Sequence, residues 1–207
     1  GEFRDAGRPV RATPIYENLK THGAVFAETF GWERAKWFDS SGDGEKYSFR
    51  RNNSYDGVAK ECIAVRERVG LLDLTCFAKY ETGGSDAESF LQRICANHIP
   101  RREGGVALVH MLTDLGGIEC EATITRIEEN KYYVLSGAVA EIHDHDWLVQ
   151  HILPDEKVSV RNVTDEYGVL VLAGPQSRDV LSKLTDADLS NAAFPWLRGK
   201  NIDVSGI

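Results

Sequence analysis

Residues 106–135 read VALVHMLTDLGGIECEATITRIEENKYYVL, and this stretch decides the fold. It contains three runs whose composition and apolar pattern are typical of strands: Val106–Leu112, Cys120–Ile127 and Tyr132–Leu135. Short turns, Asp114–Gly117 and Glu128–Lys131, separate the runs. Strands joined by such short turns run antiparallel. The sequence therefore predicts an antiparallel sheet in the middle of the chain.

Helical patterns flank this sheet on both sides. Apolar residues recur at helical spacing between Asp56 and Val69, and Ser85 with Glu88 three residues later is a capping-box signature. A further helix is expected from Ala138 to Ile152, with strands near 158–160 and 168–173 beyond it. The predicted fold class is α+β, an antiparallel sheet with helices covering one face. The first fifty or so residues show no sustained period, so we interpret them as a wrapping segment.

Composition excludes several classes of partner. Hydrophobic residues make up 42% of the 207 residues, charged residues 27%, and the net charge is −8. An acidic chain with interspersed charges has no basic groove for nucleic acid, and no apolar run approaches the roughly 20 residues of a membrane span. The four cysteines lie far apart, with no CxxC pair and no neighbouring His at ligand spacing, which argues against a zinc site and against a redox dithiol; we expect reduced, mostly buried thiols. We expect a cytoplasmic location in a bacterium, or the mitochondrial matrix in a eukaryote.

Three stretches carry residues that could act chemically. Strand alternation puts Glu119, Glu121, Thr123 and Thr125 on the face opposite Ile118 and Cys120, so Glu121 is either a solvated residue or the wall of a polar cleft. Solvent exposure is the commoner outcome for a strand carboxylate. The run 143–146, His-Asp-His-Asp, predicts an exposed helix face and no metal site, because helix neighbours one or two apart do not face each other. Residues 174–178 fit an anion-binding helix start or, more commonly, an ordinary strand-to-helix turn.

Taken in order, several stretches resemble the aminomethyltransferase family of the glycine cleavage T-protein. The resemblance is carried by residues 13–17, TPIYE; 61–74, ECIAVRERVGLLDL; 116–121, GGIECE; and 172–178, LAGPQSR. Residues 26–34, FAETFGWER, are similar to the lead-in found in members fused behind the flavin domain of dimethylglycine and sarcosine dehydrogenases. The resemblance implies a Greek-key antiparallel sheet with covering helices, truncated at its C-terminal end.

The same resemblance implies a folate site. Family members bind tetrahydrofolate, and a carboxylate after the Gly-Gly turn, normally Asp, is their key catalytic residue; Glu121 stands there. Pterin contacts fall on Leu135 and on Gly137, which replaces the usual Asn, and Phe77 occupies the position of an apolar Met. A carboxylate beside the folate nitrogens can orient them, relay a proton and stabilise a cationic iminium. FAD is implied for the full-length protein only.

Three functions remain open at this point. The first is the folate domain of a dimethylglycine or sarcosine dehydrogenase, with an N-methyl amine substrate and a flavin domain in the same chain; residues 1–55 would lead in and 56–207 would form an incomplete folate domain. Such a chain alone is expected to lack oxidase activity. The second is a stand-alone aminomethyltransferase, and the third is a non-catalytic folate-like interaction module.

Overall fold

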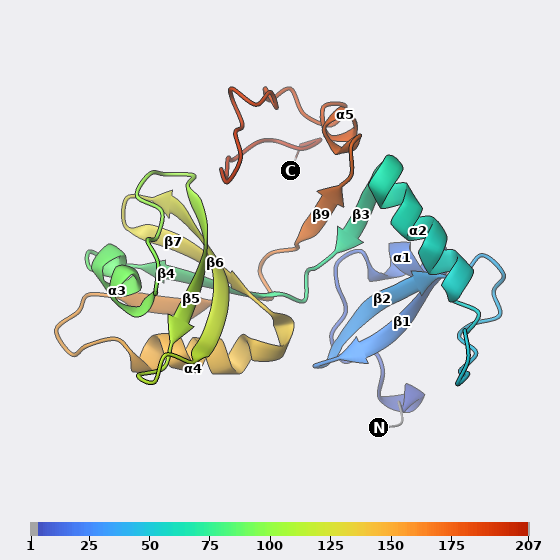
Figure 1. Ribbon diagram of the computed structural model, residues 1–207, viewed down its shortest axis with the longest axis horizontal. Helices are drawn as coiled ribbons and strands as arrows, with labels where there is room; N and C mark the ends of the chain where they lie inside the picture. The colour runs from blue at the N-terminus through green and yellow to red at the C-terminus, as the bar shows by residue number, and fades with distance from the viewer. Residues whose placement is uncertain (1–3, 207) are drawn as a thin grey trace. The chain divides into compact units, whose positions relative to one another are not determined.

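Residues 4–206 are described by the computed structural model of the protein, and they fall into two units of chain (Figure 1). Unit 1 contains residues 1–76 and 168–183, and unit 2 contains residues 77–167 and 184–207. The chain therefore leaves unit 1, builds most of unit 2, returns to unit 1 and ends in unit 2. Among the residues described, no helix is long and apolar enough to cross a membrane.

Unit 2 contains the predicted antiparallel sheet. Its five strands lie in the order β5-β6-β7-β4-β8. Their bounds are Ala78–Gly83 for β4, Val106–Leu112 for β5, Ile118–Glu128 for β6, Lys131–Ser136 for β7 and Ser159–Asn162 for β8. Every neighbouring pair is antiparallel. Because β5, β6 and β7 follow one another while β4 pairs with β7 after a long connection to β5, the order is a Greek key. The predicted fold class is confirmed.

One face of this sheet is covered by two helices, α3 (Ala87–Ile94) and α4 (Glu141–Gln150), the second preceded by a 3-10 turn at Ala138–Ala140. Phe90 and Leu91 of α3 and Leu148 of α4 belong to the same buried cluster as alternate residues of the strands, including Tyr80 and Ile124. The Tyr80 hydroxyl donates a 2.6 Å hydrogen bond to the Glu141 carbonyl, which ties β4 to α4. Helices on a single face leave the other face of the sheet available for a site.

The predicted capping box at the start of α3 is wrong. The N-cap residue is Asp86, and it makes no side-chain cap hydrogen bond. Glu88 instead accepts a 2.9 Å hydrogen bond from Arg126 of β6. A buried guanidinium needs a charged partner, and this requirement outweighs a helix cap that water can replace.

Unit 1 contains two separate two-stranded antiparallel sheets, β1 (Ala24–Thr29) with β2 (Trp32–Phe38), and β3 (Gly70–Asp73) with β9 (Leu170–Ala173). Its helices are α1 (Tyr16–Thr21), α2 (Tyr55–Glu67) and α5 (Ser177–Leu181), and a 3-10 turn spans Asp5–Gly7. Gly174 links β9 to α5 at a positive φ of 120°. A Cβ there would lie 2.6 Å from the Arg68 carbonyl oxygen, so the turn requires glycine.

The first fifty residues, interpreted as a wrapping segment because they show no sustained period, contain a regular hairpin that the sequence analysis did not predict. β1 and β2 form a hairpin whose turn residues, Phe30 and Gly31, both have positive φ, 53° and 84°. Two positive φ values in a two-residue loop are typical of a type I′ turn. Trp32 and Trp37 are buried, and the Arg11 guanidinium lies 4.1 Å from the Trp32 ring centroid. Two of the aromatic residues of this segment, Trp32 and Trp37, are therefore buried positions of a regular strand.

Candidate active site

Glu121 lies on the sheet face of unit 2 that is opposite α3 and α4. Along β6 the side chains of Cys120, Ala122 and Ile124 belong to the buried cluster, whereas Glu121 points the other way and is 61% exposed. This exposure agrees with the expectation for a strand carboxylate. It leaves the carboxylate available to a ligand approaching the open face.

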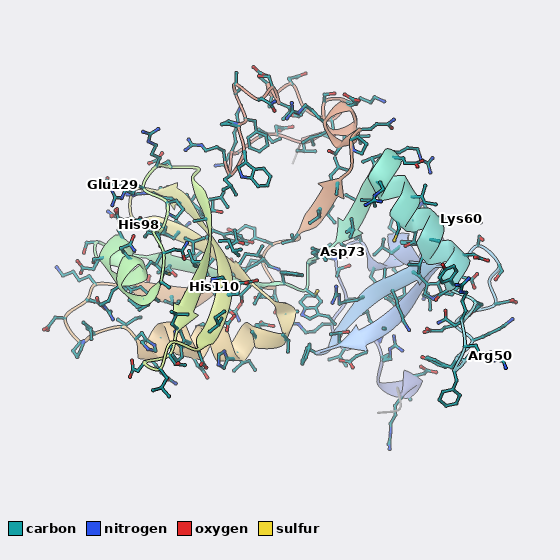
Figure 2. All side chains as sticks on the ribbon, viewed as in Figure 1. Arg50, Lys60, Asp73, His98, His110 and Glu129 are labelled. Carbon is teal, nitrogen blue, oxygen red and sulfur yellow. The ribbon has the colours of Figure 1, made fainter. Side chains whose placement is uncertain are left out.

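A histidine holds this carboxylate. His110 of β5, labelled in Figure 2, is the direct register partner of Glu121. Its Nε2 lies 2.8 Å from Glu121 Oε2. The other oxygen, Oε1, has no hydrogen-bond partner among the residues that the structure describes. An exposed pair of this kind contributes only about 0–1 kcal/mol to stability. Its consequence is therefore the orientation of the carboxylate, with one oxygen fixed and one open.

The other predicted site residues lie beside Glu121 on neighbouring strands. Ala122 pairs with Ser136, so the register continued by one residue sets Gly137 beside Glu121. Ala78 also pairs with Ser136, and Phe77 immediately precedes it. Leu135 occupies the next row of the same face, between Thr123 and Lys79. The structure thus brings Glu121, Gly137, Phe77 and Leu135 together at one end of the sheet, within unit 2.

Sequence reasoning missed two residues of this face. Lys79 is fully buried, and its ammonium donates a 2.9 Å hydrogen bond to the Phe77 carbonyl. His110 was also overlooked. The signal for both was strand alternation: Lys79 shares its face with Leu135, and His110 shares its face with Glu121 across the turn at 114–117. A lysine in an alternating strand reads as a solvent-facing residue, which is why it carried no weight.

A charged network borders the site along the same face. Glu81 of β4 lies 2.7 Å from Arg161 of β8 and 3.1 Å from Lys131 of β7. Burial raises the pKa of Glu81, but the hydrogen bonds from Arg161 and Lys131 outweigh it, so the net pKa lies below the ordinary value. Tyr133, opposite Glu81, has a pKa raised to about 12, first by burial and then by the charges nearby. The Glu81 carboxylate is therefore paired with two cations, whereas Glu121 has one oxygen without a hydrogen-bond partner among the described residues.

The run 143–146 differs from its prediction. Asp144 is 5% exposed and packs under the sheet, so the interpretation of this run as an exposed helix face is wrong for Asp144, although it holds for His143 and Asp146. Glu119 also departs from the predicted alternation. Met111 pairs with Cys120 while Leu112 pairs with Ile118, so Glu119 is the unpaired residue of a bulge, and its carboxylate reaches His143 of α4. Bulges commonly re-aim a side chain in this way.

Comparison with known proteins gives the family. Residues 15–207 match the GCVT N-terminal domain. The chain belongs to this family. Its fold agrees with that of the glycine cleavage system aminomethyltransferase T of Bartonella henselae, with a TM-score of 0.70 over 84% of this chain and 44% of that one, at 22% identity. The resemblance inferred from the sequence is confirmed.

Two relatives of this GCVT N-terminal domain indicate its wider context. Mitochondrial dimethylglycine dehydrogenase of Mus musculus is 37% identical over 210 residues, covering 100% of this chain and 24% of that protein. The mitochondrial pyruvate dehydrogenase phosphatase regulatory subunit of Mus musculus is 30% identical over 205 residues, covering 96% and 23%. The chain thus spans about a quarter of the length of the curated relatives that it matches.

Proposed function

We propose that this chain is the folate-binding part of a dimethylglycine or sarcosine dehydrogenase-like enzyme. In that enzyme a one-carbon unit passes from an N-methyl amine to tetrahydrofolate and gives methylene-tetrahydrofolate. The observation that carries the proposal is Glu121, an exposed carboxylate with one open oxygen, beside Leu135, Gly137 and Phe77 on a face without helices. The flavin domain of the full-length chain is the proposed partner, with FAD as its cofactor.

The residues of this face suit tetrahydrofolate in type. Apolar side chains such as Leu135 and Phe77 can contact a flat ring, and a carboxylate can accept hydrogen bonds from ring N–H groups. Gly137 has no side chain, which leaves room beside Glu121 and removes one polar contact. When bound, tetrahydrofolate supplies the nitrogens that take up the one-carbon unit. The donor set of the face is therefore compatible with the group.

The roles of the residues follow from their chemistry. Glu121 Oε1 would accept a hydrogen bond from a folate nitrogen, and the carboxylate would then hold or return a proton and stabilise a neighbouring cation. His110 would keep Oε2 in place, so that the side chain does not rotate away from the ligand. Leu135 and Phe77 would exclude water from one side of the ring.

Calorimetric titration of a stable reduced folate into the full-length protein tests the proposal. We expect binding by the unaltered protein and loss of at least about tenfold in affinity in Glu121→Ala, which corresponds to about 1.4 kcal/mol. Glu128→Ala, on the same strand and exposed at its far end, is the matched control and should bind normally. Equal binding by both variants would remove Glu121 from the site.

A second candidate is a non-catalytic module used for regulation. The relative named as a regulatory subunit favours it, as does Gly137 in place of the family's usual Asn. The same titration separates the candidates, because a regulatory module that has lost the ligand would bind folate in neither protein. Amine-dependent formation of methylene-tetrahydrofolate by the full-length protein would exclude the second candidate.

A further inference from the structure

Three side chains with metal-binding atoms meet on the covered side of the sheet in unit 2. Cys120 lies on β6, and His143 and Asp144 lie on α4. One ligand atom from each, the thiol sulfur, a ring nitrogen and a carboxylate oxygen, all lie within 4.8 Å of one another. Cys120 and Glu121 point to opposite faces of β6, so this group is separate from the proposed folate site.

Adjacent helix residues converge here for an identifiable reason. Asp144 points under the sheet, and the His143 ring turns toward it, which brings Nδ1 to 2.9 Å from Asp144 Oδ1. The argument that helix neighbours do not face each other concerns their Cα–Cβ directions, and a long side chain overcomes it. The expectation that the run 143–146 offers no metal site loses its basis.

A carboxylate outside the cluster, that of Glu119, orients the His143 ring. His143 Nε2 lies 2.9 Å from Glu119 Oε1, and the bulge in β6 is what aims Glu119 there. A carboxylate on one ring nitrogen fixes the tautomer and directs the lone pair of the other nitrogen toward a metal, as is common for metal-bound histidines. Here that other nitrogen is Nδ1, which faces Asp144 and Cys120.

The cluster also contains a buried carboxylate, that of Asp144. The Asp144 side chain is 7% exposed, and the contacts given for it in the described chain are with His143 and the Cys120 thiol. The described contacts give this carboxylate one half-exposed histidine as a charge partner, and a divalent cation would add a second.

We propose that Cys120, His143 and Asp144 bind Zn²⁺, with Glu119 as the residue that positions His143. Thiolate, imidazole and carboxylate are the three donor types of protein zinc sites, and three protein ligands leave a fourth position for water. Ligands about 2.0–2.3 Å from the ion lie about 3–4 Å apart, so Nδ1 and Oδ1, which are 2.9 Å apart, must separate slightly on binding. Binding releases the Cys120 thiol proton and any proton on His143 Nδ1 to solvent, and no electron is transferred.

Cobalt titration of the tag-free 207-residue chain, stripped of metal by a chelator, provides the test. Cys62 is exposed, so all proteins carry Cys62→Ser to remove a competing thiol. We expect a sulfur-to-cobalt charge-transfer band and tetrahedral visible bands with one cobalt per chain, both removed by added Zn²⁺. Cys120→Ser should lose the charge-transfer band, whereas Cys95→Ser, which removes another buried thiol of unit 2, should keep it.

Two further variants keep the test decisive if Cys120→Ser does not fold. His143→Gln alters a half-exposed side chain and should lose binding while circular dichroism stays unchanged. Glu119→Gln should keep the band but weaken affinity about 10–100-fold, as second-shell changes do. Zinc should raise the Tm of the parent protein and of Cys95→Ser, and should leave that of His143→Gln unchanged. Absence of the band in the parent protein, or its persistence in His143→Gln, would overturn the proposal.

Discussion

The two units differ in how much of their apolar surface they bury. Unit 2 has a five-stranded sheet under two helices, and most of the fully buried side chains of the described residues belong to it. Unit 1 has two sheets of two strands each, and α2, its longest helix, has no buried residue. Large apolar side chains of β3 and β9 are exposed, namely Leu71, Leu72, Leu170 and Val171.

This difference teaches that strand propensity and strand stability are separate properties. β3 and β9 are as apolar in sequence as the strands of unit 2, yet isolated two-stranded sheets are only marginally stable in water. Unit 1 also holds a cleft of about 650 Å³ between residues of β2, α2 and β3, lined mainly by apolar atoms. We expect unit 2 to set the global stability of this chain and unit 1 to open locally.

Hydrogen exchange should give the largest contrast. In the 207-residue chain, amides of β6 and β7 should exchange only through global unfolding, whose free energy is typically about 5–15 kcal/mol. Amides of β3 and β9 should exchange through local opening that costs several kcal/mol less. Mass spectrometry of peptides from both regions measures this directly. Equal protection of β3 and β6 would break the comparison, since it would mean that the two units unfold together.

A matched pair of leucines sharpens the comparison. Leu91→Ala in α3 removes a side chain that is 0% exposed and should lower the free energy of unfolding by about 2–5 kcal/mol, because a cavity remains. Leu72→Ala in β3 removes one that is 43% exposed and should cost less than about 1 kcal/mol. Urea denaturation monitored by circular dichroism measures both. Similar costs would show that Leu72 is more deeply packed than its exposure indicates.

Two arginines of unit 2 test whether burial also governs ion pairs. Buried Arg126 donates to the Glu88 carboxylate and to the Arg101 carbonyl, each at 2.9 Å, and Lys cannot reproduce this fork. Arg126→Lys should cost about 1.5–3 kcal/mol. Arg161→Lys alters a half-exposed ion pair and should cost less than about 1 kcal/mol. Urea denaturation of both variants measures this, and the midpoint of Arg126→Lys should be the lower of the two. A lower midpoint for Arg161→Lys would contradict the argument.

Local signals predicted the fold where local physics decides it. β5 was predicted with the bounds observed, Val106–Leu112, because apolar alternation and a tight Gly-containing turn are both encoded nearby. The β1–β2 hairpin was missed because its turn uses Phe30, a residue that rarely takes positive φ. Strand alternation alone predicted that Glu121 lies on a strand and that its side chain points away from Cys120.

Other parts of the site depend on contacts that no local pattern contains. The bulge at Glu119 arises from the pairing of β5 with β6, and it sends that carboxylate to α4 instead of to the face of Glu121. The burial of Asp144 depends on α4 packing against the sheet. Lys79 is buried by tertiary structure, although its type predicts exposure. Register and packing between distant elements set these positions, and the roles of Glu121, Leu135, Gly137 and Phe77 stay predictions.

Lowering the pH should have the smallest effect on stability, and one carboxylate in each unit tests it. Hydrogen bonds lower the pKa of Asp39 in unit 1, chiefly that from the Ser41 hydroxyl, and the pKa of Glu81 in unit 2 is lowered by Arg161 and Lys131 against the opposing effect of burial. A lowered folded-state pKa contributes stability that is present above the unfolded-state pKa and is lost as pH falls through the folded-state value.

Glu81→Gln should therefore destabilise the chain at neutral pH by less than about 1 kcal/mol, since its partners lie near solvent. The difference from the parent protein should shrink as the pH falls through the lowered folded-state pKa of Glu81, because the native carboxyl is then protonated. Urea midpoints against pH measure this, whereas Asp39→Asn should alter exchange in unit 1 and leave the midpoint unchanged. A midpoint that shifts with pH equally in both variants would mean that Asp39 and Glu81 belong to one cooperative unit.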